Sequence, residues 1–254
     1  MDELNENYNL KKYFREIVSD KLKVFEEITR WGEQEKEQFA QLLADLERPF
    51  DKDNETTKEK GDKLEKLVEF IIRNSYFYDV YKNIRTETNE VDEIIILSDR
   101  GKQALSTHGL SKELLPTQQE IFLGECKNYK TSLSVTYVGK FYSLLVATDT
   151  TFGLIFTRNG LSGRTEGYTD AYGLTKILRL IEKYKNNSEL CILTFTTEDY
   201  HKLLEGQTFF ELIKAKKLEL QMASNYQNFL QENAHENLDE IKSVIQEKLQ
   251  NTVR

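Results

Sequence analysis

The sequence has few residues that interrupt or cross-link a chain. Only two prolines, Pro49 and Pro116, occur among 254 residues, so long helices can run without a break. The two cysteines, Cys126 and Cys191, both lie in apolar runs and are expected to be buried free thiols. This pair excludes a disulfide framework and a cysteine zinc site, and it favours a reducing cytoplasm.

Long apolar runs are also missing. No stretch approaches the roughly 20 apolar residues that a membrane-spanning helix needs. The first residues, MDELNENYNLKKYF, do not show the basic and then apolar layout of a signal peptide. We therefore expect a cytoplasmic protein with no membrane partner.

Positive charge is not in excess either. Lysine and arginine total 35 against 43 aspartate and glutamate residues, which gives a formal net charge of −8. Proteins that bind nucleic acid nonspecifically normally present a basic surface that displaces counterions. Binding of nucleic acid by this chain therefore requires a local basic patch, a metal ion or a partner protein.

Apolar periodicity divides the chain into three regions. Residues 1–55 carry apolar side chains at helical spacing and predict one or two amphipathic helices, which end at Arg48 because the following proline disfavours helix. Residues 56–220 form an expected core, in which 98–119 is an insertion. Residues 221–254 show a further helical pattern. The two helical ends are expected to serve oligomerisation or docking to a partner.

Strands and helices alternate within the expected core. Strands are predicted over 76–87, 91–97, 120–127, 152–157 and 190–196, and helices over 61–72, 138–147, 169–185 and 199–220. Strands separated by helices favour an α/β fold with a mixed sheet flanked by helices.

The candidate site centres on the strand IFLGECK, residues 121–127. Alternate side chains of a strand share a face, so Glu125 and Lys127 point to the same side while Cys126 points away. Asp92 begins the preceding strand, VDEIIIL, and Glu65 lies on the exposed side of the first core helix. Three acids and one lysine thus fall at the edges of successive elements.

These residue types suit a divalent metal. Mg²⁺ takes carboxylate, carbonyl and water oxygens, often with only one or two protein carboxylates. Asp92, Glu125 and the backbone carbonyl of Cys126 are candidate ligands, and Glu65 is a candidate for a second metal or a metal-bound water. Lys127 could orient or deprotonate a water, or offset charge in a transition state.

The arrangement resembles the PD-(D/E)XK nuclease superfamily, which has the restriction-endonuclease-like fold. The residues that carry the resemblance are Gly61-x-x-x-Glu65-x-Leu67-Val68, Asn89-Glu90-Val91-Asp92, Gly124-Glu125-Cys126-Lys127-Asn128-Tyr129 and the later Gly153–Gly160. Within the superfamily the chain is similar to the Mrr-like, defence-associated branch, although Val91 replaces the proline of the signature. The resemblance covers about residues 58–205.

The resemblance implies a function and a site. It implies an endonuclease that uses Mg²⁺ or Mn²⁺ to hydrolyse phosphodiester bonds, with DNA favoured, in prokaryotic restriction or anti-phage defence. Carried over position by position, the site residues are Glu65, Asp92, Glu125 and Lys127. A cut through both strands needs two sites, which implies a homo-oligomer or a partner protein.

Several residues around this motif are candidate substrate contacts. For the loop after the fourth strand, a polar turn is an equally good interpretation, and the helix that carries Lys140 is chiefly a core element. The candidates are Tyr129, Lys130, Lys140, Arg158, Asn159 and Arg164.

Two other functions remain open. The fold could belong to a noncatalytic interaction subunit of a multiprotein defence complex, which the acidic balance favours slightly. A nuclease acting on RNA, or on structured or modified DNA, would use the same residues.

Overall fold

The computed structural model describes residues 2–48, 56–85, 90–163 and 170–222. Within these ranges the chain is an α/β protein built on one open sheet. The strands are β1 Tyr78–Arg85, β2 Glu90–Leu97, β3 Ile121–Lys127, β4 Phe152–Thr157 and β5 Cys191–Phe195. The helices are α1 Asp2–Thr29, α2 Glu33–Glu47, α3 Thr57–Arg73, α4 Asp99–Thr107, α5 Val135–Ala147, α6 Asp170–Ile181, α7 Thr197–Leu204 and α8 Phe209–Gln221, with the short helical segments η1 Lys112–Leu114 and η2 Glu182–Asn186.

The sheet is mixed, and its spatial order follows the sequence, β1-β2-β3-β4-β5. β1, β2 and β3 form an antiparallel meander, while β3, β4 and β5 run parallel to one another. α5 connects β3 to β4, and α6 connects β4 to β5, as the long crossovers between parallel strands require. The predicted mixed α/β sheet flanked by helices is therefore confirmed.

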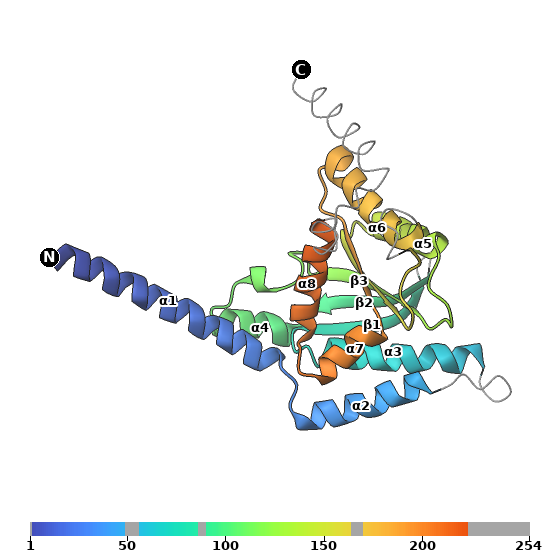
Figure 1. The fold of residues 1–254 in the computed structure, drawn as a ribbon, viewed down its shortest axis with the longest axis horizontal. Helices are drawn as coiled ribbons and strands as arrows, with labels where there is room; N and C mark the ends of the chain where they lie inside the picture. Colours follow the sequence, from blue (N-terminus) through green and yellow to red (C-terminus); the bar gives the residue numbers. More distant parts are fainter. Residues whose placement is uncertain (1, 49–55, 86–89, 164–169, 223–254) are drawn as a thin grey trace, which may run out of the picture.

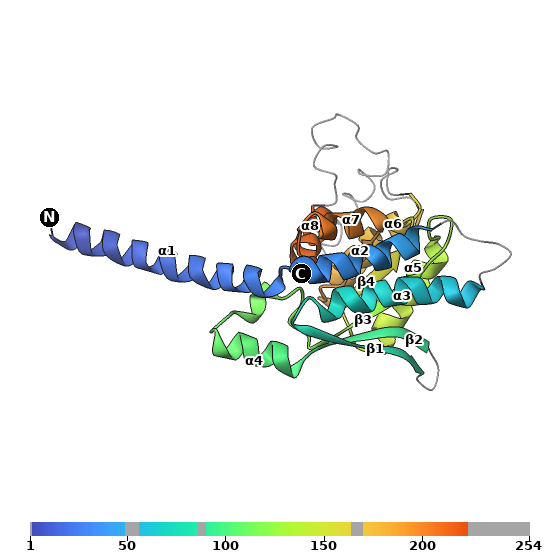
Figure 2. The same ribbon diagram turned by 90° about the horizontal axis from the view of Figure 1, so that it is seen from below.

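Helices cover both faces of the sheet. α3, α7 and α8 pack on one face, and α2 lies outside them against α3 and α7. α5 and α6 pack on the other face. Figures 1 and 2 show this layering and show α1 projecting away from the layered body.

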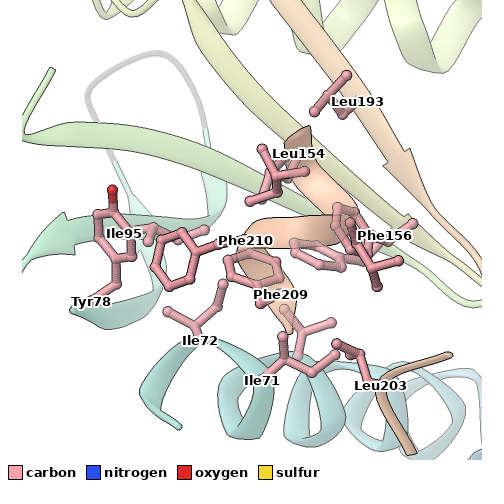
Figure 3. Close-up of a cluster of buried hydrophobic side chains, with 14 of the residues drawn as sticks. Ile71, Ile72, Tyr78, Ile95, Leu154, Phe156, Leu193, Leu203, Phe209 and Phe210 are labelled. Carbon is pink, nitrogen blue, oxygen red and sulfur yellow. The ribbon is translucent and has the colours of Figure 1, made fainter. Parts of the chain in front are cut away.

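The larger hydrophobic core lies between the sheet and α3, α7 and α8. Figure 3 shows Ile71 and Ile72 of α3 facing Phe209 and Phe210 of α8. Phe122 stands at the centre of the sheet side of this core, with its ring 5.1 Å from the ring of Tyr78 and 5.1 Å from that of Phe152. Burial of apolar side chains, these aromatic rings among them, is the dominant favourable contribution to folding.

The first core helix begins earlier than expected. Residues 57–60, which precede the helix predicted over 61–72, form the first turn of α3. The Thr56 hydroxyl accepts a hydrogen bond from the backbone N–H of Glu59, and the Glu59 carboxylate accepts one from the backbone N–H of Thr56. This reciprocal capping box satisfies N–H groups that have no partner inside the helix.

Two other boundaries also differ from the prediction. The segment 199–220 is not one helix, because Gly206 at φ +103° ends α7 and a second capping box, Thr208 with Glu211, begins α8. β1 begins at Tyr78 rather than at residue 76, because Tyr76 has φ +74°, outside the extended region.

The N-terminal region contains two helices, and α2 ends just before Arg48, as predicted. The insertion 98–119 holds α4 and η1. The helix expected over 221–254 lies outside the described residues beyond position 222. None of the helices within the described ranges combines the length and the apolar character that a membrane crossing requires.

The packing of Phe122 yields a test of the core. We expect Phe122→Ala to lower the free energy of unfolding by about 3–5 kcal/mol, because the fully buried ring leaves a cavity that its neighbours cannot fill. Val146→Ala on the exposed side of α5 is the control and should change it by less than about 0.5 kcal/mol. Urea unfolding measures both, and equal losses would contradict this account of the core.

Candidate functional site

The pairing of β2 with β3 brings the predicted acids together. The two strands are antiparallel, with Glu93 opposite Gly124, so the start of β2 lies beside the end of β3. Continuing this register by one residue places Asp92 beside Glu125, on the face of the sheet that α5 and α6 cover. Glu93 and Cys126 face the opposite side, toward α3.

One ammonium group joins the two carboxylates. Lys127 Nζ lies 2.7 Å from Asp92 Oδ2 and 2.8 Å from Glu125 Oε1. Asp92 Oδ2 also accepts a hydrogen bond from the backbone N–H of Cys126 at 3.1 Å. The three side chains are between 18% and 22% exposed, so the cluster is partly screened from solvent but open to it.

Burial and mutual charge shift the pKa values in this cluster. Burial raises the pKa of Glu125, and the negative charge of Asp92 raises it further, against the positive charges of Lys127 and Lys140. Burial alone would lower the pKa of Lys127, but Glu125 and Asp92 outweigh this and raise it above its usual value. Lys127 is therefore held firmly in the protonated form.

The donor set is small for a metal site. Within the described ranges, no three His, Cys, Asp or Glu side chains are grouped so as to hold a metal ion. The carboxylates of Asp92 and Glu125 nevertheless lie close enough together for both to contact one positive group, the ammonium of Lys127. Two carboxylates with an adjacent backbone carbonyl suit Mg²⁺, which keeps several of its waters when it binds protein.

Glu65 is the predicted site residue that the structure does not join to this cluster. It lies on α3, which packs against the other face of the sheet. In the described part of the chain, no hydrogen bond or ion pair connects it to Asp92, Glu125 or Lys127. Its charge acts instead on Glu93 and Cys126, whose pKa values it helps to raise.

Two polar residues next to the site were not predicted. Glu93 is fully buried and accepts a hydrogen bond from the Cys126 thiol at 3.3 Å. Asn128 donates to the backbone carbonyl of Lys60 at 2.6 Å and so ties the end of β3 to α3. A signal for Glu93 was present in the sequence, since an acid in the middle of an apolar strand requires a partner.

The candidate substrate contacts lie at different distances along the chain from the acidic cluster and have different partners. Lys140 is exposed on α5, and its charge acts on Glu125. Tyr129 packs its ring 5.4 Å from the ring of Tyr137, and its backbone carbonyl accepts a hydrogen bond from Asn159 at 2.8 Å.

Arg158 and Lys130 follow the ends of β4 and β3. Arg158 donates to the backbone carbonyl of Glu47 at 2.9 Å and so ties this loop to α2. Lys130 is exposed three residues beyond Lys127. Arg164 lies outside the described residues. Among the described candidates, Lys140 is an exposed lysine whose charge acts on Glu125.

Comparison with known proteins adds no relative. The chain matches no protein-family model, no curated protein and no solved structure.

The burial of Glu93 predicts a pH dependence of stability. Burial raises the pKa of Glu93 to about 8 from its ordinary value near 4.5, and the charges of Glu65 and Asp92 add to the rise. Because the folded-state pKa is the higher one, this contribution to stability is fully present below about pH 4.5 and is lost as the pH rises through 8.

Glu93→Gln should remove this dependence. Between pH 5 and pH 8.5 the wild type is expected to lose about 2–4 kcal/mol of unfolding free energy relative to Glu93→Gln, since one pKa unit corresponds to about 1.4 kcal/mol. Chemical denaturation in the presence of a chelator at several pH values measures the difference. Parallel curves for the two proteins would contradict a raised pKa at Glu93.

Proposed function

We propose that this protein is a nuclease of the PD-(D/E)XK type that hydrolyses phosphodiester bonds with Mg²⁺ or Mn²⁺. The observation that carries the proposal is the position of Lys127, which contacts both Asp92 and Glu125 at the ends of two neighbouring strands. A lysine beside two converging carboxylates supplies the charges that cleavage of a phosphodiester needs, namely ligands for a cation and a donor for the phosphate.

The order of elements supports the restriction-endonuclease-like fold. The resemblance implies the order α-β-β-β-α-β, and the chain runs α3, β1, β2, β3, α5, β4, with α4 and η1 inserted between β2 and β3. The acid of the second strand and the E-x-K end of the third strand then meet, because those strands are antiparallel neighbours. The fold and the motif thus support the same proposal by separate routes.

Each side chain of the cluster has its own role in the proposed reaction. When bound, the metal would supply an activated water and offset charge on the scissile phosphate. Asp92 and Glu125, with the carbonyl of Cys126, would hold it, and Glu65 would serve only if α3 brought its carboxylate to a second ion. Lys127, which contacts both carboxylates, would place a positive charge and a hydrogen-bond donor beside the phosphate.

The substrate we propose is DNA, in the setting of prokaryotic restriction or anti-phage defence. An acidic chain needs local positive charge to approach a phosphate backbone; Lys140 supplies it beside the site, and a bound divalent ion would add to it. RNA carries the same phosphodiester, so a substrate comparison belongs with the first assay.

Cleavage of both strands requires two such sites, so the proposal includes a second copy or a partner protein held through the helical flanks. The form of α1 supports this, because the helix projects from the layered body in both views (Figures 1 and 2). Val18 and Leu22 on this helix are 56% and 43% exposed. The same helix would suit a noncatalytic interaction subunit, which the assay below separates from a nuclease.

Plasmid cleavage tests the proposal. Purified protein with Mg²⁺ or Mn²⁺ is expected to nick or linearise plasmid DNA, and Asp92→Ala, Glu125→Ala and Lys127→Ala should each reduce the rate at least 100-fold. These variants remove the ligands or the positive charge on which the transition state depends.

The chain provides matched controls for this experiment. Lys102 and Glu120 form an exposed ion pair at 2.7 Å near the other end of β3, so Lys102→Ala and Glu120→Ala remove the same charges far from the site. Both should keep wild-type activity. Cleavage that survives Glu125→Ala and Lys127→Ala would refute the site, and a wild type inactive with every metal and with both DNA and RNA would favour the interaction subunit.

The charge of Lys140 gives a separate prediction for binding. If this ammonium contacts a phosphate, Lys140→Ala should weaken DNA binding and lower the slope of log affinity against log salt by about 1. Lys185→Ala, an exposed lysine in η2, is the control. Titration of labelled duplex in a chelator, where no cleavage occurs, measures the slope, and identical slopes for both variants would exclude Lys140 as a contact.

A further inference from the structure

Glu93 contacts the end of β3 from the side opposite to the predicted site. Its carboxylate is fully buried beneath the sheet, on the face that α3 covers, and Oε1 accepts a hydrogen bond from the Cys126 thiol at 3.3 Å. On the other face, the backbone N–H of Cys126 donates to Asp92. Cys126 is therefore held from both faces by consecutive residues of β2.

The space that Glu93 occupies is left open by its partner strand. Gly124 stands directly opposite Glu93, and a Cβ at position 124 would lie 2.8 Å from Oε2 of Glu93 and 3.1 Å from its Cβ. Any larger residue at 124 would push the carboxyl group aside. The absence of a side chain at position 124 thus allows Glu93 to reach Cys126.

This arrangement costs stability. Among the described residues, Glu93 Oε2 has no hydrogen-bond partner although it is fully buried. An unsatisfied buried polar atom lowers the stability of the fold, whereas an apolar side chain there would pack without that cost. Ile95, two residues further along the same strand, is apolar and fully buried in the core on the α3 face. A core role alone does not explain a carboxyl at this position.

We propose that Glu93 is a positioning residue, which fixes Cys126 and thereby sets the place of the Glu125 carboxylate, the Cys126 carbonyl and the Lys127 ammonium. The inference rests on the proposed function where activity is the readout. Its physical basis is that the three groups belong to consecutive residues, so a rotation of the Cys126 peptide moves all of them. Displacements of about 1 Å in such groups can reduce rates about 100-fold.

Glu93→Leu is the main test. Leucine has a similar size and fills the buried space, but it offers no acceptor to the thiol. We expect kcat to fall at least tenfold with KM within twofold, while the denaturation midpoint at pH 8 stays the same or rises. Glu93→Gln keeps an acceptor oxygen and should restore kcat to within about threefold of the wild type.

The effect should pass through Cys126. Cys126→Ala is expected to reproduce the loss in kcat, and the double variant with Glu93→Leu should be no slower than the slower single variant, because both remove one contact. Tyr78→Phe is the control. It removes a buried polar group on the same face of the sheet, a hydroxyl without a partner among the described residues, and it should leave kcat unchanged.

Amide hydrogen exchange provides a readout that does not need activity. In metal-free protein, Glu93→Leu should speed exchange of the Cys126 amide at least tenfold, while the amide of Phe122, in the same strand, keeps its wild-type rate. Unchanged exchange at Cys126, or unchanged kcat in an active enzyme, would overturn the inference. A wild type that cleaves nothing would refute the proposed function, and exchange at Cys126 would then decide the inference alone.

Discussion

The antiparallel pairing of β2 with β3 is the constraint on which the candidate site depends. Side chains alternate between faces along a strand, so a shift of the register by one residue would move Asp92 to the α3 face and bring Glu93 to the α5 face. The close fit of Glu93 over Gly124 opposes such a shift, because moving the register by one residue would set Glu93 opposite Leu123 or Glu125, which both carry side chains. The same contact therefore aligns the strands and places the acids.

Much of this site could be predicted from the sequence. The two-residue repeat of a strand is enough to place Glu125 and Lys127 on one side. Their meeting with Asp92 needed one further step, that consecutive strands are often neighbours in the sheet. Both steps use regularities of the backbone, and the contacts of Lys127 with the two carboxylates agree with them.

The rest could not be predicted because it depends on which face each element covers. Periodicity places Leu64, Leu67 and Val68 of α3 toward a core, but it does not say against which side of the sheet that core lies, and so it could not place Glu65 relative to Asp92. The partner of Glu93 could not be predicted for the same reason, because the thiol of Cys126 reaches Glu93 only across the β2–β3 pair. Helix boundaries differed where capping side chains of Thr56 and Thr208 set them.

The local charges explain how an acidic chain could act on an anionic substrate. Asp92, Glu125 and Lys127 together carry one net negative charge, which would repel a phosphate and attract a cation. A divalent ion at the two carboxylates would reverse that sign, and Lys140 on α5 would add to the positive field. If the protein acts as proposed, the cation would have to bind before the substrate, because without it the site is negative like the chain as a whole. An anionic substrate would then prefer the metal-loaded site over the metal-free site because of charge alone, and the protein would not need a basic surface.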